Sequence, residues 1–225
     1  MKDPKMMSWF EPNFSCPNLW LRGIPGAGKT VLTSMMVEEA VRLGSCTFTY
    51  VYCKYKDGRK DNFKAIARAL LNQMVRTNQD LVPHLYEECV SSGQVVLDSE
   101  KQLRTNLKKV CQCLEDSFLI IDGIDECNTV ERRKFLTFVP PIVGKAKDVQ
   151  ENTMRGLFIN RDEGSIRRMF SQAVIRKIGV NDNSPDIRSF TALQVSKLVE
   201  KFEISEAIGV KLISMVTGRA KGELV

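Results

Sequence analysis

The stretch Leu19–Leu32, LWLRGIPGAGKTVL, places an apolar run before a glycine-rich loop, and then a lysine and a threonine before further apolar residues. Glycines at 23, 26 and 28 let the chain turn tightly and leave its backbone N–H groups exposed. Residues 23–30 match the pattern GxxxxGK[ST], with a predicted strand before it and a predicted helix after it. This context favours a phosphate-binding loop over a glycine turn that carries a solvated lysine.

Each residue type in this loop suits a chemical role at its position. Lys29 is long enough to reach the β- and γ-phosphates of a nucleotide, and the Thr30 hydroxyl is a suitable ligand for Mg²⁺. The first turn of the following helix adds a partial positive charge. The residues that we expect to hold the nucleotide are Gly23, Pro25, Gly26, Ala27, Gly28, Lys29, Thr30 and Val31.

A second pattern, FLIIDGIDE at residues 118–126, is an apolar run that ends in carboxylates. As the last residue of a buried strand, Asp122 would lie at the sheet edge where open α/β folds bind ligands. We expect Asp122 to hold Mg²⁺ together with Thr30, through water. Asp125 and Glu126 follow, and either carboxylate is a candidate to orient or deprotonate an attacking water. Such acids are usually only solvated, but their combination with the glycine loop favours a catalytic interpretation.

A third pattern, GLFINRDE at residues 156–163, ends a predicted strand with Asn160 and Arg161. If this strand neighbours the strand before the loop or the strand of Asp122, Arg161 points toward the γ-phosphate and distinguishes a triphosphate from a diphosphate. The alternative is a surface ion pair. Lys29, Asp125, Glu126 and Arg161 are therefore the candidate catalytic residues.

Short apolar runs alternate with segments of helical period, which is typical of a parallel sheet flanked by helices. We predict a three-layer α/β fold of the P-loop NTPase kind, with a mostly parallel central sheet of about five strands and a small, partial helical appendage. Its parts would be a lead-in segment at 1–18, the NTPase core at 19–180 and a helical subdomain at 181–225. The predicted strands are Leu19–Arg22, Cys46–Cys53, Phe118–Asp122, Arg155–Asn160 and Ala173–Ile178.

The helical segments are predicted from their apolar stripes and caps. In the helix after the loop the stripe comprises Val31, Leu32, Met35, Met36, Ala40 and Val41, with Gly44 at its end. Asp61 is a plausible N-cap for a helix from Phe63 to Met74, and Ser99 with Gln102 a plausible capping box. We also expect residues 80–90 to be helical.

The composition argues against several classes of protein. No apolar run in the 225 residues approaches the ~18 needed to cross a bilayer, and the first residues have no apolar signal core, so we expect a cytoplasmic protein without membrane contact. Seven cysteines with one histidine and no CxxC pair indicate reduced thiols. The net charge of +6 comes from interleaved charges, which favours a solvated surface over nucleic-acid binding.

Two other classes of P-loop protein are tested by motifs that the chain lacks or has in another form. No [NT]KxD motif for reading guanine is present, which disfavours a GTPase. A small-molecule kinase would carry an arginine-rich lid, but the arginine pairs at 132–133 and 167–168 lie in segments predicted to be helical.

Together these patterns resemble the NACHT class of STAND P-loop NTPases, and most closely the fungal NOD-like receptors and the nephrocystin-like N-terminal NTPase domains. The resemblance rests on four sequence segments: LWLRGIPGAGKTVL, FTYVYCKYKDG, FLIIDGIDEC and NSPDIRSF. The DGxDE form at 122–126 is the most specific of them. The resemblance implies a truncated domain, with effector and sensing regions outside this chain.

The resemblance further implies an ATP-dependent signalling switch that is closed with ADP, opens on exchange for ATP, oligomerises or meets protein partners, and is reset by slow hydrolysis. The first hypothesis is therefore a domain that binds ATP or ADP with Mg²⁺ and is a weak ATPase. The second is a nucleotide-bound interaction module without useful catalysis. A metabolic P-loop kinase is the third.

Overall fold

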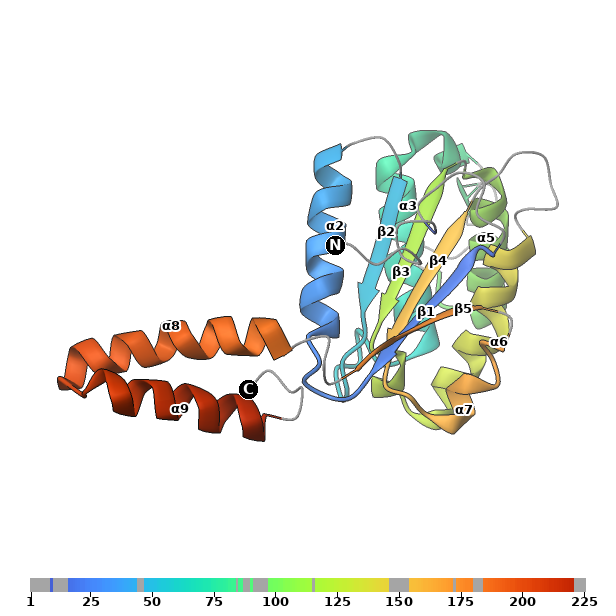
Figure 1. Ribbon diagram of the computed structural model, residues 1–225. Helices are drawn as coiled ribbons and strands as arrows, with labels where there is room; N and C mark the ends of the chain where they lie inside the picture. The colour runs from blue at the N-terminus through green and yellow to red at the C-terminus, as the bar shows by residue number, and fades with distance from the viewer. Residues whose placement is uncertain are drawn as a thin grey trace.

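Five parallel strands form one sheet in the computed structural model, which describes residues 9, 16–43, 47–83, 85–86, 90, 97–114, 116–145, 154–171, 173–179 and 184–220 (Figure 1). Each predicted strand is confirmed to within one residue at its ends, and the predicted end Cys46 lies outside the described residues. The strands are β1 (Asn18–Gly23), β2 (Thr47–Tyr52), β3 (Ser117–Asp122), β4 (Arg155–Asn160) and β5 (Val174–Ile178). The chain thus has the predicted α/β fold of a P-loop NTPase.

The strand order is β2-β3-β4-β1-β5, so β4 lies between the strand of the glycine loop and the strand of Asp122. All neighbouring pairs are parallel, with Arg22 beside Asn160 and Asp122 beside Ile159. The carboxyl ends of these strands therefore meet at one edge of the sheet. This meets the condition set for Arg161, because the strand that precedes it neighbours both of the other two.

Helices cover both faces of this sheet (Figure 1). On one face, Met36 and Val37 of α2 pack in a cluster with Leu19, Leu21 and other strand residues. On the other face, α3, α5 and α6 bury a larger cluster that includes Trp20 and Phe158. The helices of the core are α2 (Lys29–Leu43), α3 (Phe63–Thr77), η1 (Gln79–Leu81), α5 (Glu100–Cys113), η2 (Ile124–Glu126), α6 (Thr129–Lys145) and α7 (Gly164–Arg167).

Some local predictions were wrong, and each has a physical reason. Met36 of α2 is buried and Leu32 is partly buried, as predicted, but Val31, Met35 and Val41 are exposed, because the buried stripe continues through Thr33 and Val37 instead. The N-cap of α3 is Asn62, whose side chain accepts a hydrogen bond from the Ala65 N–H at 3.0 Å; Asp61 stands one residue too early.

Other local predictions are met in part or fall elsewhere. Ser99 is the N-cap of α5, but its side chain forms no capping hydrogen bond. In 80–90 the described residues are helical, whereas 84 and 87–89 lie outside the described part of the chain. Three further predictions concern residues outside the described part of the chain. They are Gly44, the side chain of Ala40, and the lead-in segment apart from residues 9 and 16–18.

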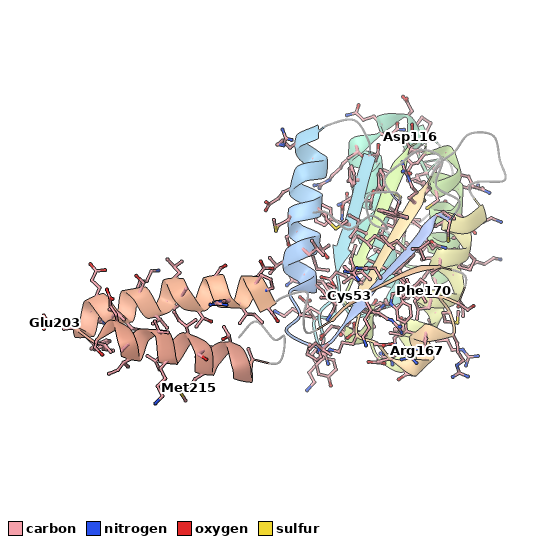
Figure 2. The ribbon with its side chains drawn as sticks, viewed as in Figure 1. Cys53, Asp116, Arg167, Phe170, Glu203 and Met215 are labelled. Carbon is pink, nitrogen blue, oxygen red and sulfur yellow. The ribbon has the colours of Figure 1, made fainter. Side chains whose placement is uncertain are left out.

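The last two helices, α8 (Ser184–Phe202) and α9 (Glu206–Arg219), pack against each other and extend away from the sheet (Figure 1). Glu203 lies at the far tip of this hairpin (Figure 2). Ile187, Thr191 and Val195 of α8 are buried. The division into segments 1–18, 19–180 and 181–225 stays a prediction. Among the described residues no helix is long and apolar enough to cross a membrane.

Candidate functional site

The glycine loop joins β1 to α2 and bends through two left-handed residues. Gly26 has φ of 69° and Gly28 has φ of 72°, and a side chain at either position would be strained. The helix begins at Lys29, so its first N–H groups have no partner within the helix. A tightly bent loop followed by a helix N-terminus is suited to binding an anion.

The Lys29 ammonium currently binds the loop itself. Its Nζ donates to the carbonyl oxygens of Gly23 at 3.0 Å and Ile24 at 2.7 Å. Burial lowers the pKa of Lys29, and the carboxylates of Asp125 and Asp122 oppose this shift. An ammonium that is partly buried against carbonyls gains from an incoming phosphate, which offers it full negative charge.

Asp122 closes β3 as an almost fully buried carboxylate, 5% exposed. It accepts a hydrogen bond from the Thr30 hydroxyl, while its Oδ2 has no hydrogen-bond partner in the described structure. Burial raises the pKa of Asp122, and the Thr30 hydrogen bond and the charge of Lys29 counteract the rise. A buried carboxylate oxygen without a partner, next to a hydroxyl, fits the oxygen ligands that Mg²⁺ requires.

We expect Asp122→Asn to stabilise the metal-free, nucleotide-free chain more at pH 7 than at pH 4. Burial makes the pKa of Asp122 higher in the folded than in the unfolded chain, so the contribution of this one group to stability is most favourable below the ordinary aspartate pKa of ~3.9 and is lost as pH rises through the folded pKa. Asparagine does not titrate and removes this loss. Urea unfolding in EDTA at both pH values measures the difference.

A gain for Asp122→Asn that is the same at pH 4 and pH 7 would contradict the electrostatic origin of the effect.

Arg161 follows β4 and forms two ion pairs inside the candidate site. Its Nε lies 3.2 Å from Asp125 Oδ2, and its Nη2 lies 3.3 Å from Glu126 Oε1. Glu126 also accepts a hydrogen bond from the Tyr55 N–H, at 3.4 Å. Asp125 is 5% exposed and Glu126 33%, so Glu126 is the more accessible carboxylate. The ion pair considered for Arg161 therefore exists, and its partners are the two candidate catalytic acids.

These side chains surround one cavity of about 360 Å³ at the carboxyl edge of the sheet. It is lined by Pro25, Gly26, Lys29, Thr30, Tyr52, Cys53, Lys54, Asp122, Gly123, Asp125, Glu126, Asn160 and Arg161. Of the residues predicted to hold nucleotide, the structure does not place Gly23, Ala27, Gly28 and Val31 in the lining. The Ala27 side chain is buried in the core, and Val31 is exposed on α2.

The cavity also contains Tyr52–Lys54 and Asn160, which the sequence patterns did not predict as site residues. Their position in the sequence could have identified them. Each of these residues ends or follows a strand, and the carboxyl ends of these strands share one edge of the sheet. Cys53 appears at this edge in Figure 2. A hydrogen bond with Cys127 and burial raise the pKa of the Cys53 thiol, which stays protonated and is no nucleophile at neutral pH.

The arginines weighed for a kinase lid lie on helices, as predicted. Arg132 and Arg133 belong to α6, Arg167 to α7, and Arg168 caps α7. Arg132 pairs with Glu163 at 2.6 Å, and Arg167 pairs with Asp162 at 2.8 Å. None of these arginines lines the cavity.

The strand order, the glycine loop and the acidic strand end define the class of this chain: it is a P-loop NTPase domain. The model of the family described as nephrocystin 3, N-terminal, matches residues 1–161. The chain belongs to this family, and it is therefore an NTPase domain of the NACHT and STAND type.

Two known proteins are similar to this chain, one in sequence and one in fold. The vegetative incompatibility protein HET-E-1 of Podospora anserina is 26% identical over 117 residues, which are 49% of this chain and 9% of that protein. A chain of the solved structure of Drosophila ORC bound to DNA superposes with a TM-score of 0.51 at 12% identity, covering 88% of this chain and 49% of that one. The second likeness concerns the fold alone. This chain spans half or less of either relative.

Proposed function

We propose that this chain is the nucleotide-dependent motor of a signalling switch of the NOD-like receptor type, which binds ATP or ADP with Mg²⁺ and hydrolyses ATP slowly. The observation that carries the proposal is the single cavity that Lys29, Thr30 and Asp122 line together with the Asp125–Glu126–Arg161 cluster. Cationic, hydroxyl and carboxylate groups from separate segments converge there, as phosphoryl transfer requires.

Each group has a role that follows from its surroundings. Lys29 exchanges its two loop carbonyls for β- and γ-phosphate oxygens. Thr30 and the unpaired oxygen of Asp122 would hold Mg²⁺, which neutralises phosphate charge when bound. Glu126, the more accessible acid, orients or deprotonates the attacking water.

Arg161 and the second acid complete the proposed site. Arg161 holds Asp125 and Glu126 in place and offers its positive charge to the terminal phosphate.

The position of β5 supports coupling between the nucleotide and the helical hairpin. Ile178 pairs with Gly23 at the start of the loop, and a Cβ on Gly23 would lie 3.2 Å from the Ile178 carbonyl oxygen. A loop that moves on nucleotide exchange would therefore press on the carboxyl end of β5, which precedes α8 in the chain.

The decisive experiment is mass spectrometry of the nucleotide that denatured, purified protein releases, together with an ATP turnover assay. We expect ADP or ATP in stoichiometric amount and turnover that is slow but above that of heat-denatured protein. Protein that contains no nucleotide and does not bind added ATP would refute the proposal.

A second candidate, a nucleotide-bound interaction module, is favoured by the outer surface of the helical hairpin. Exposed apolar side chains on it include Phe190, Leu193, Phe202, Ile208 and Val210. Such a module would contain stoichiometric ADP and show no turnover, so the same experiment separates the two. Self-association or protein partners, in the cytoplasm, belong to both candidates. ATP-dependent phosphorylation of a small acceptor would instead support a kinase.

A further inference from the structure

A buried hydrogen bond connects the strand before the loop to the end of β4. The indole Nε1–H of Trp20 donates to Asn160 Oδ1 at 2.8 Å, and the two residues are 0% and 1% exposed. An indole nitrogen can only donate, so the amide oxygen of Asn160 must be the atom that faces Trp20. The NH₂ group of Asn160 is thereby left as the other branch of the amide.

This NH₂ group is buried and has no hydrogen-bond partner in the described structure. Asn160 lines the cavity, which offers the place for such a partner. A buried N–H without an acceptor costs free energy, and an anionic oxygen that enters the cavity recovers it. Arg161, by contrast, is already engaged by Asp125 and Glu126.

Two contacts hold the indole ring of Trp20, which sets this orientation. Phe170, labelled in Figure 2, stacks on the Trp20 ring with centroids 5.5 Å apart and an interplanar angle of 22°. The Arg22 guanidinium lies 5.1 Å from the centre of the same ring. The ring therefore cannot turn its N–H away from Asn160 without disturbing the core.

We propose that Trp20 is a positioning residue: it holds the Asn160 amide with its NH₂ group toward the cavity, where this group donates to a γ-phosphate oxygen and favours triphosphate over diphosphate. The inference rests on the proposed function of the cavity. The sign of the effect depends on the amide orientation, because a flipped amide presents its oxygen, which repels a phosphate. The indole N–H thus decides whether Asn160 attracts or repels the ligand.

The test is Trp20→Phe, which keeps the aromatic ring against Phe170 and removes the N–H donor. Calorimetry with ATPγS and with ADP, both with Mg²⁺, measures the ratio of the two dissociation constants. We expect the preference for ATPγS to fall about tenfold, the size of one hydrogen bond to a charged acceptor, while ADP affinity stays nearly constant.

Trp9→Phe is the matched control. Trp9 is also 0% exposed, and its indole N–H also donates to one acceptor, the Pro17 carbonyl oxygen at 3.2 Å, but it is not in the cavity lining. This variant should keep the parent's preference for ATPγS. In the background of Asn160→Ala, Trp20→Phe should have no further effect on the preference, because Trp20 acts through the amide.

Nuclear magnetic resonance supplies a readout that a purely structural role would not change. The Trp20 indole N–H resonance should shift when ATPγS is added and shift much less with ADP.

The outcomes separate this inference from the proposed function. Equal preference for ATPγS in Trp20→Phe and Trp9→Phe, or a loss of ATPγS and ADP affinity in equal proportion, overturns the role of Trp20 and leaves nucleotide binding intact. A parent chain that binds neither nucleotide overturns both.

Discussion

Replacing Lys29 by alanine will abolish ATP binding at micromolar concentrations of nucleotide. The side chain supplies the only lysine ammonium on the loop, and each hydrogen bond from a charged group contributes ~1.5–3 kcal/mol. Loss of two such bonds to the phosphates weakens binding by roughly 10² to 10⁴-fold. Isothermal calorimetry with ATPγS and Mg²⁺ measures the affinity directly.

Lys101→Ala, which removes an exposed lysine of α5, is the control and should bind as the parent does. Because Lys29 also bonds the Gly23 and Ile24 carbonyls, circular dichroism and thermal unfolding must show that the variant is folded. A folded Lys29→Ala protein with unchanged affinity would remove the loop from the nucleotide site.

Replacing Glu126 by glutamine will leave ATP affinity nearly unchanged and lower the turnover rate by ~10² to 10⁴-fold, the usual contribution of a general base. Glutamine keeps the size of the side chain but cannot accept a proton or carry charge. Asp125→Asn should also lower the turnover rate, but by less than Glu126→Gln does. The reason is that the Asp125 side chain is more buried than that of Glu126 and pairs with Arg161 Nε, so it is less accessible to an attacking water. Phosphate release and calorimetry measure the two quantities separately.

The acidic residue Glu131 provides a control outside the cavity, since its carboxylate caps α3 by accepting the Phe63 N–H at 2.8 Å. Glu131→Gln should keep full turnover at temperatures below its unfolding transition. If Glu126→Gln and Asp125→Asn both hydrolyse ATP as fast as the parent, neither acid takes part in the reaction.

Local sequence patterns were sufficient for the elements of the fold and for much of the site. The strand runs, the glycine loop and the acids at 122–126 are consecutive residues whose spacing reports local backbone geometry. The exposed face of α2 was predicted wrongly because apolar residues occur around more of that helix than it buries. Val31 and Met35 are exposed, while the polar Thr33 is fully buried.

The pairings across the site could not be predicted in this way. Arg161 was expected near the phosphates only on the condition that its strand neighbours the other two, and the sequence carries no sign of the strand order. The order β2-β3-β4-β1-β5 meets the condition and also brings Arg161 against Asp125 and Glu126. Strand order depends on contacts between residues far apart in the chain, which no local spacing records.

The sequence by itself determined that a phosphate-binding loop and an acidic strand end exist, because each is a continuous segment with its own backbone requirements. Only the tertiary structure decided that Asn160 stands between them with its oxygen held by Trp20. The reason is that a hydrogen bond between residues 140 positions apart arises from the packing of β1 beside β4, and this packing is a property of the whole sheet.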